Sequence, residues 1–304
     1  MSGADLLPEL RSARDLIRWG ASEFVRKDLY FGHGTDNALD EAYALVCWVL
    51  KLGYELPPEY LGAAVSAAER AEILDLFSRR ISSRKPAAYL TGEAWFCGLS
   101  FAVDERVLVP RSPLAELIQQ EFSPWLTTPP GQVLDLCCGS GCIGIAAAHV
   151  LPDAEVDLLD IDEGALELAS QNVARHGLQA QVSVRQSDLF AAVPGKRYDL
   201  ILSNPPYVPS ADYAALAPEF MHEPRLGLEA GADGMDLVAR ILAEAPDHLS
   251  EAGTLICEVG AAMNHFLDRF ATLEVIWPDF EHGGEGIFIV GRDALLAWQQ
   301  QQES

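Results

Sequence analysis

The chain of 304 residues has few cysteines, few basic residues and no long apolar run. Six cysteines are too few for a disulfide scaffold in a chain of this size. We expect reduced, buried thiols of a cytoplasmic protein, and no metal site, because no second Cys or His pair stands at ligand spacing. A membrane-spanning helix, which needs about 20 apolar residues, is not expected. The first residues also lack the basic start and apolar stretch of a signal peptide.

Basic residues are outnumbered by acidic ones. Lys and Arg total 21 against 45 Asp and Glu, which gives a formal net charge of −24. Proteins that bind nucleic-acid phosphates usually carry a basic face, so direct DNA or RNA binding is disfavoured. A basic protein is the better electrostatic match. Simple solubility explains the charge as well, so the charge excludes more than it identifies.

The length suits about two domains. Residues 1–87 are expected to form a small helical domain, because apolar residues recur at helical spacing in residues 15–25, 40–52 and 69–82. Pro57 and Pro58 can start a further helix there.

Residues 88–109 are predicted to be a linking β-hairpin. The stretch 95–103 alternates in polarity and contains Gly98 where a hairpin could turn, and residues 107–109 are extended. Ser112 and Pro113 then have the character of an N-cap and a first helical residue.

Residues 110–304 are predicted to form an α/β domain with a doubly wound parallel sheet. Strand candidates and helical segments such as 165–176 and 237–249 alternate in that part of the chain. The end of the chain differs. Residues 274–277 and 286–290 are strand candidates with only a short Gly-rich connection, residues 282–284, between them, which predicts an antiparallel hairpin at the sheet edge. The parallel strand candidates are Val133–Leu136, Glu155–Leu159, Val182–Gln186, Asp199–Ser203 and Thr254–Val259.

The first strand candidate runs into a glycine-rich turn, residues 137–141, and a helix follows. Glycines there allow a ligand close to the backbone and leave helix N–H groups free. Asp160 ends the next strand, where a carboxylate can accept hydrogen bonds from ribose hydroxyls. Asp188, with Leu189 beside it, follows the third strand and could take an adenine amino group. The glycine-rich turn suits a nicotinamide dinucleotide as well as S-adenosylmethionine. The residues at the end of the fourth strand distinguish these two ligands.

The fourth strand candidate ends in Asn204-Pro205-Pro206-Tyr207. Such a tetrapeptide alone often means only a rigid loop. Here it suits a planar NH₂ group, which needs two fixed acceptors: the Asn204 side-chain oxygen and the Pro205 carbonyl. The prolines stiffen the backbone, and Tyr207 offers an aromatic face. Holding both N–H bonds can polarise a weakly nucleophilic amide nitrogen and aim it at a sulfonium methyl.

These motifs together resemble the class I methyltransferases that modify amino groups on planar systems. The Asn-Pro-Pro-Tyr form is shared by adenine-specific DNA methyltransferases and by glutamine methyltransferases of the HemK type. The chain is similar to the second group over nearly its full length, including Pro110-Arg111, Glu223-Pro224 and residues 230–234. The resemblance implies a Rossmann-like, seven-stranded sheet with a C-terminal antiparallel hairpin.

Two branches of that group act on different proteins. One methylates peptide release factors, and the other, the PrmB type, methylates ribosomal protein three of the large subunit. Residues 108–113 continue Pro-Arg as the PrmB type does, and Cys137 replaces the first glycine as in that branch. Cys138 departs from the usual Thr but is also small.

The resemblance assigns roles to single residues. It implies that the cofactor, S-adenosylmethionine, is held by Asp135, Cys137, Gly139, Ser140, Gly141, Asp160, Asp188, Leu189 and Asn204. It implies that the glutamine is held by Asn204, Pro205, Pro206 and Tyr207, with Asn204, Pro205 and Tyr207 catalytic. We expect the helical domain and the hairpin to dock the protein substrate, because the α/β domain alone offers a pocket for one side chain.

Other functions remain open at this stage. A release-factor methyltransferase differs only in the accepting protein. A DNA adenine methyltransferase is disfavoured by the acidic charge. A silent ribosome assembly factor would not bind S-adenosylmethionine, and a nicotinamide oxidoreductase would bind a different cofactor.

Overall fold

The structure, a computed structural model, describes residues 9–53, 56–281 and 283–302. The chain divides into two compact units. The first, here called the helical unit, contains the chain up to Ala94 together with Ala217–His222. The second, here called the sheet unit, contains the rest of the chain. The division at Ala94 falls inside the segment 88–109 that the sequence assigned to a linking hairpin.

The helical unit contains the helices that the apolar spacing predicts. Their bounds are α2 (Ala13–Arg26), α3 (Ala38–Leu50), η1 (Pro58–Gly62), α4 (Ala67–Ser83) and α5 (Ala87–Thr91). Ser12 and Ser66 begin α2 and α4 with capping boxes, in which the serine side chain and the third helical residue satisfy each other's backbone N–H groups. The apolar faces of these helices meet in one core, in which Phe24 and Phe77 are fully buried with rings 5.2 Å apart.

A segment from far along the chain completes the helical unit. The 3-10 helix η2 (Pro218–His222) brings Glu219, whose side chain is buried. Arg80, also fully buried, donates to Glu41 over 2.8 Å and to the backbone carbonyl of Tyr30 over 2.8 Å, and lies 3.4 Å from the Glu219 carboxylate. Arg84 adds a second contact to Glu219 at 3.1 Å. Buried charges are costly unless paired, so this cluster needs all its members.

The predicted hairpin is present. Strands β1 (Glu93–Phe96) and β2 (Leu99–Ala102) pair with each other, and Cys97 and Gly98 both have positive φ in the turn between them. Two consecutive left-handed residues are what a tight hairpin turn requires.

The sheet unit is built on a six-stranded sheet in the order β5-β4-β3-β6-β7-β8. The first five strands run parallel, and β8 pairs antiparallel with β7 at the edge. All five parallel strand candidates are confirmed, and their bounds are β3 (Gln132–Leu136), β4 (Glu155–Asp160), β5 (Val182–Gln186), β6 (Tyr198–Ser203) and β7 (Leu249–Glu258). Central strands covered on both faces contain continuous apolar runs, as Leu200, Ile201 and Leu202 show.

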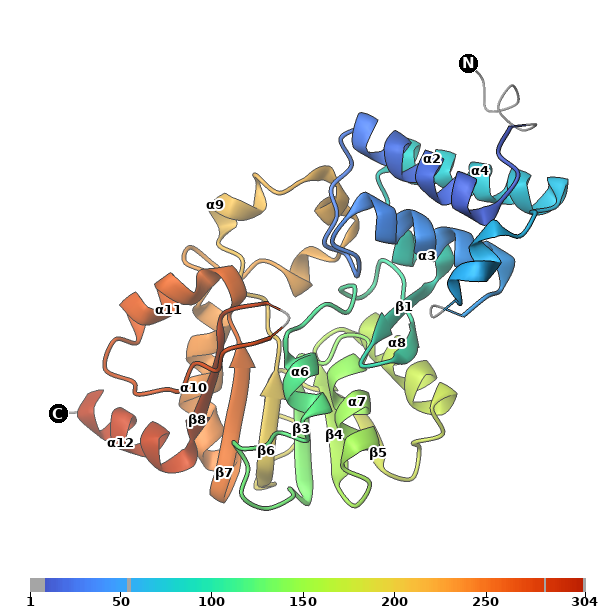
Figure 1. Cartoon of the computed structure of the whole chain (residues 1–304). Helices are drawn as coiled ribbons and strands as arrows, with labels where there is room; N and C mark the ends of the chain where they lie inside the picture. Colours follow the sequence, from blue (N-terminus) through green and yellow to red (C-terminus); the bar gives the residue numbers. More distant parts are fainter. Residues whose placement is uncertain (1–8, 54–55, 282, 303–304) are drawn as a thin grey trace. The chain divides into compact units, whose positions relative to one another are not determined.

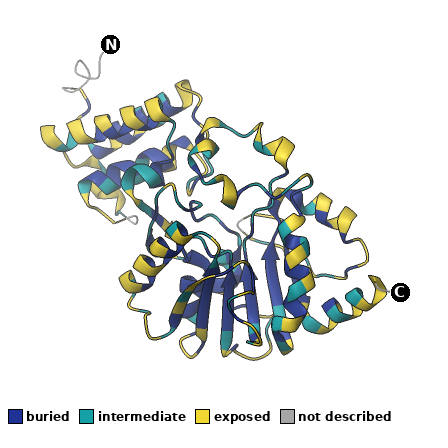
Figure 2. Ribbon diagram, turned by 180° about the vertical axis from the view of Figure 1, so that it is seen from behind, coloured by how far each residue is buried: buried dark blue, intermediate teal, exposed yellow. Residues whose placement is uncertain are grey.

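Helices cover both faces of this sheet. Helix α7 (Cys142–Val150) lies on one face (Figure 1) and contacts α6 (Leu114–Gln119) and α8 (Glu163–Arg175). Helix α10 (Asp236–His248) lies on the opposite face (Figure 2) and contacts α12 (Arg292–Gln302). The shorter elements of this unit are α9 (Ser210–Tyr213), η3 (Arg225–Gly227), η4 (Gly260–Ala262) and α11 (Met263–Arg269).

Two details differ from the sequence predictions. The described residues form six strands in this sheet rather than seven, because residues 274–277 contribute a single antiparallel bridge, Ile276 to Ile289, beside β8 (Ile287–Gly291). One residue of the predicted connection, residue 282, lies outside the described part. Helix α6 begins at Leu114, one residue later than predicted, although the Ser112 hydroxyl still accepts its N–H over 3.1 Å.

The helices between residues 9 and 302 that the structure describes include none with the length and hydropathy needed to cross a lipid bilayer.

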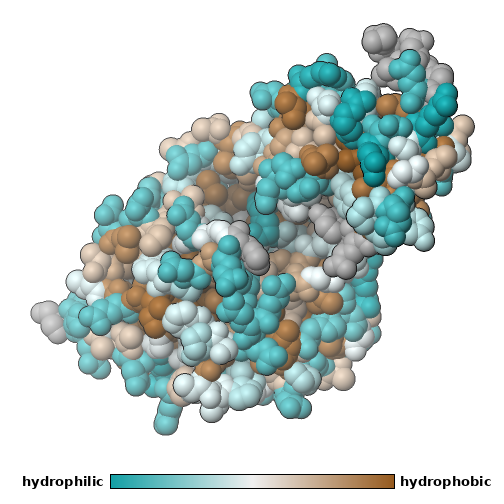
Figure 3. Space-filling view, in the orientation of Figure 1, coloured by the Kyte–Doolittle hydropathy of each residue, from teal (hydrophilic) through white to brown (hydrophobic). Residues whose placement is uncertain are grey.

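Acidic residues far outnumber basic ones in the sheet unit. Figure 3 shows hydrophilic residues spread over the visible face of this unit, with hydrophobic ones scattered among them.

Candidate active site

The glycine-rich turn lies at the carboxyl end of β3, where open parallel sheets bind ligands. Cys137, Gly139 and Gly141 all have positive φ, at 62°, 52° and 77°. Cys137 therefore holds a left-handed conformation that glycine adopts at lower cost. A side chain at Gly141 would come within 2.9 Å of Leu158, so this glycine allows α7 to approach the sheet.

Asp135 lies beneath the turn rather than in an open site. It is fully buried, and its Oδ2 accepts the Gly144 N–H of α7 over 2.8 Å. Burial raises the pKa of Asp135 to about 7; the hydrogen bond from Gly144 lowers the pKa and the nearby Asp160 carboxylate raises it, both less than burial does. Its contact with the first turn of α7 fixes the turn in place.

Asp160 is oriented by the backbone. Its Oδ2 accepts the N–H of Gly139 over 2.8 Å, and its Oδ1 accepts the N–H of Asp162 over 3.0 Å. A carboxylate has about four acceptor positions, so two bonds leave it able to accept more. Asp188 is more exposed, and Arg240 of α10 lies 2.9 Å from its Oδ1. Burial raises the pKa of Asp160.

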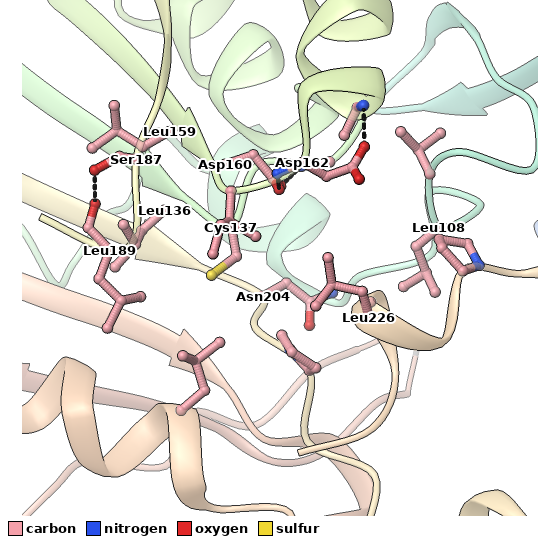
Figure 4. Close-up of a pocket in the computed structure, with 18 of the residues that line it drawn as sticks. Leu108, Leu136, Cys137, Leu159, Asp160, Asp162, Ser187, Leu189, Asn204 and Leu226 are labelled. Atoms are coloured by element: carbon pink, nitrogen blue, oxygen red, sulfur yellow. Dashed lines mark hydrogen bonds between the residues drawn. The ribbon is translucent and has the colours of Figure 1, made fainter. Parts of the chain in front are cut away.

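A cavity of about 300 Å³ opens over these groups. In Figure 4, Leu136, Leu159 and Leu189 lie on one side of it and Asn204, Leu226 and Leu108 on the other, with Cys137 and Asp160 between them. The lining therefore combines apolar walls, the three carboxylates of Asp160, Asp162 and Asp188, and the primary amide of Asn204. Such a site suits a ligand with a flat apolar ring, hydroxyl groups and a neighbouring amide.

Seven of the sequence-predicted site residues line this cavity: Cys137, Gly139, Asp160, Asp188, Leu189, Asn204 and Pro206. The other five, Asp135, Ser140, Gly141, Pro205 and Tyr207, do not line it. Ser140 is buried, and its carbonyl accepts from Asn172. Pro205 lies between two lining residues. Tyr207, which the sequence predicted to face the target group, lies outside the lining and packs against the core of the sheet unit.

The loop that contains Asn204 is fixed at both ends. Before it, the Ser203 hydroxyl donates to the carbonyl of Leu136 over 2.7 Å, which ties the ends of β6 and β3 together. After it, Val208 forms a parallel bridge with Glu229, in which its N–H donates to the Leu228 carbonyl over 2.7 Å. Asn204 therefore stands on a rigid backbone facing the glycine turn.

The two walls beside Asn204 come from segments that the sequence noted separately. Arg111 makes two hydrogen bonds of 2.6 Å to the Glu223 carboxylate, which also accepts the Val109 N–H over 3.0 Å. Leu108 and Pro224, the neighbours of these groups, line the cavity. The ion pair thus holds the two walls at a fixed distance. His222, directly before Glu223, is half-buried, and its Nε2 lies 2.9 Å from the Ser83 carbonyl in the helical unit.

Sequence reasoning missed several site residues. Arg106, Leu108, Leu226, Leu237 and Arg240 line the cavity. The spacing of Leu237 and Arg240, three apart on α10, places both on one helix face, which is a usable signal. Glu258, whose carboxylate accepts the Tyr207 hydroxyl, was missed as well, because nothing local marks its partner.

Comparison with known proteins identifies relatives of the chain. The family model described as "Methyltransferase small domain" matches residues 115–277. A protein of Xanthomonas campestris named ribosomal protein uL3 glutamine methyltransferase is 51% identical over 95% of this chain and 94% of its own. A protein of the same name from Bordetella pertussis is 47% identical over 94% of this chain and 97% of its own.

The chain belongs to the family of ribosomal protein uL3 glutamine methyltransferases. The predicted PrmB-type resemblance is thereby confirmed, and so is the class I methyltransferase fold. Among solved structures, a methyltransferase from Pyrococcus furiosus is similar with a TM-score of 0.47 and 19% identity, covering 75% of this chain and 99% of its own. The hMettl16 catalytic domain is similar with a TM-score of 0.48 and 14% identity, covering 78% of this chain and 86% of its own.

Proposed function

We propose that this protein transfers a methyl group from S-adenosylmethionine to the side-chain amide nitrogen of a glutamine in ribosomal protein uL3. The observation that carries the proposal is the 51% identity, over 95% of the chain, to a uL3 glutamine methyltransferase. The strongly acidic sheet unit suits a basic protein substrate.

The cavity fits S-adenosylmethionine in its chemistry. Asp160, held by two backbone N–H groups, would accept hydrogen bonds from the ribose hydroxyls, and Asp188, paired with Arg240, would accept one from the adenine amino group. Leu189 supplies apolar wall for the adenine ring, and Gly139, where a side chain would meet nothing within 4 Å, leaves room beside the backbone. Asp135, Ser140 and Gly141 act beneath the turn by keeping its shape. When bound, S-adenosylmethionine supplies an electrophilic methyl group.

The chain's own residues then hold the acceptor. The Asn204 side-chain oxygen and the Pro205 carbonyl accept the two N–H bonds of the glutamine amide, which raises electron density on the nitrogen. Pro206 and Leu226 flank the stem of that side chain. As the N–CH₃ bond forms and the S–CH₃ bond breaks, the nitrogen gains positive charge, which Asn204 and Pro205 stabilise. One of its protons leaves to water afterwards, so the rate depends on positioning rather than on a strong base.

The experiment uses tritiated S-adenosylmethionine with two acceptors, uL3 and a peptide release factor. Each acceptor is also tested with its target glutamine changed, and the Asn204→Ala enzyme is tested beside the unchanged one. Label on uL3 that requires its glutamine and Asn204 is the expected result. Label only on the release factor would overturn the uL3 assignment and keep the reaction type. Cofactor binding without label on either acceptor would overturn the substrate class.

We also propose that the helical unit docks the protein substrate, because the cavity of the sheet unit takes only one side chain. Deleting residues 1–85 is a poor test, since Glu219 would lose Arg80 and Arg84. Charge reversal at exposed acidic positions of this unit, such as Glu72→Lys and Asp75→Lys on α4, changes the surface that a basic substrate would meet. A higher KM for uL3 with unchanged cofactor affinity is expected, and an unchanged KM in a scan across this surface would contradict docking.

A further inference from the structure

Glu258 ends β7 as a buried carboxylate next to the loop that contains Asn204. Only 4% of its surface is exposed. Its Oε1 accepts the Tyr207 hydroxyl over 2.9 Å, and its Oε2 accepts the Ser112 hydroxyl over 2.5 Å. A buried carboxylate is tolerated only where donors satisfy it, so each of these bonds matters to the other groups. Glu258 therefore joins β7, the start of α6 and the substrate loop.

Tyr207 is held at three points. Its hydroxyl is bound by Glu258. Its ring lies against Gly260, where an added Cβ would come within 2.7 Å of the ring carbon Cζ. Its carbonyl lies against Gly234, where an added Cβ would come within 2.0 Å of the oxygen. Both glycines have positive φ, at 43° and 77°, which other residues rarely adopt. The residue is thus fixed in one position by its hydroxyl, ring and backbone.

This restraint reaches the site through a stiff connection. Two prolines separate Tyr207 from Asn204, and each fixes its own φ angle. Asn204 and Pro206 line the cavity, whereas Tyr207 and Glu258 do not. Few backbone torsions between Tyr207 and Asn204 are therefore free to absorb a shift of Tyr207 before it reaches the oxygens that hold the acceptor.

We propose that Glu258 is a positioning residue of the methyl-transfer site, which fixes Tyr207 and through it the Asn204–Tyr207 loop. The inference rests on the proposed function for its kinetic readout. Tyr207 then serves the reaction mainly through its hydroxyl and its fixed backbone, and its ring need not stack on the target amide.

The test compares Glu258→Ala with Glu258→Gln. Glutamine keeps an acceptor for the Tyr207 hydroxyl, whereas alanine removes it. We expect kcat for uL3 methylation to fall by about 100-fold in Glu258→Ala, the effect of a displacement near 1 Å, and by only a few-fold in Glu258→Gln. Cofactor affinity and KM should stay within about two-fold of the unchanged enzyme in both variants, since neither residue lines the cavity. Glu251→Ala, an exposed position on the same strand, is the matched control.

Two further measurements separate positioning from general destabilisation. Tyr207→Phe should lower kcat as Glu258→Ala does, and the double variant should be no slower than the slower single one. Hydrogen exchange of the Tyr207 and Val208 amides should rise in Glu258→Ala while exchange in β3 and β4 stays unchanged.

Unchanged kcat in Glu258→Ala would overturn the proposal. Equal loss in the alanine and glutamine variants would overturn it too, and so would exchange that rises throughout the sheet unit. If the unchanged enzyme fails to methylate uL3, the proposed function fails, while the exchange measurement still decides whether Glu258 holds the loop.

Discussion

Arg111 and Glu223 lie 112 positions apart in the chain and form a two-point ion pair, with both distances at 2.6 Å. Glu223 is fully buried at its side chain, and Arg111 is 22% exposed. Each residue stands in a segment that the sequence marked separately, before the α/β domain and after the substrate loop. The pair explains why both segments accompany this fold, because together they form the walls of one cavity.

Arg111→Ala should lower the free energy of unfolding by about 3 kcal/mol, because it leaves the buried Glu223 charge unpaired. Arg111→Lys should recover only part of this, since an ammonium cannot make both bonds. Urea denaturation measures the change. Arg225→Ala is the control, because its ion pair with Glu229 is exposed at the arginine and should contribute nothing measurable. Equal stability of Arg111→Ala and the unchanged protein would show that the pair is not needed.

Gly234→Ala should abolish most activity, because its Cβ would press on the Tyr207 carbonyl. Gly195→Ala is a matched control: Gly195 also has positive φ, at 73°, but an added Cβ there meets nothing within 4 Å. Both substitutions should cost about 1 kcal/mol of stability for the left-handed backbone. Only Gly234→Ala should also reduce kcat, by about 100-fold. Similar kcat values in the two variants would disprove the steric argument.

Asp160→Ala should weaken S-adenosylmethionine binding by about 10- to 100-fold, the usual effect of losing hydrogen bonds to a charged group. Titration calorimetry with the purified enzyme measures it. Asp153→Ala, an exposed carboxylate in the turn before β4, should bind as the unchanged enzyme does. Identical affinities in the two variants would remove Asp160 from the cofactor site.

Stability should depend on pH through Asp135. Its pKa in the folded protein is about 7 because of burial, against about 3.9 in an unfolded chain. Between these values the folded state binds the extra proton, so the contribution of Asp135 to stability falls as pH rises from about 4 to about 7. Asp135→Asn cannot ionise, so its stability relative to the unchanged protein should rise over that range. Parallel curves from urea denaturation at several pH values would contradict this.

Arg80→Met should destabilise the helical unit by about 3–5 kcal/mol, because two buried carboxylates, Glu41 and Glu219, would lose their shared partner. Arg79→Met is the control, since Arg79 is exposed on the same helix. Hydrogen exchange in α3 and α4 measures the difference. Slow exchange in Arg80→Met equal to that of Arg79→Met would show that the cluster can rearrange without cost.

The fold was largely predictable because its signals are local. Apolar period, serine caps and glycine turns act within a few residues, and they gave the helices of the helical unit, the hairpin and the five parallel strands. The carboxyl ends of parallel strands meet at one edge, so Asp160, Asp188 and Asn204 could be placed around one cavity before the structure was known.

The remainder depends on contacts between distant positions. Glu219 meets Arg80 across 139 positions, and Glu258 meets Ser112 across 146. A carboxylate in an apolar strand has no neighbour in sequence that identifies its donor. The partner of Tyr207 was missed for the same reason: the aromatic ring is evident from the sequence, but the acceptor for its hydroxyl, Glu258, is not.

The position of residues 217–222 within the helical unit affects the chain's connectivity. The polypeptide enters the sheet unit after Ala94, returns to the helical unit for these six residues, and leaves it again. A protease that cuts once between Ala94 and Trp95 would therefore not release the N-terminal helices, because Glu219 remains bound by Arg80 and Arg84. The helical unit thus consists of two separate segments of the chain. An exchange of this unit between related enzymes must transfer both segments together.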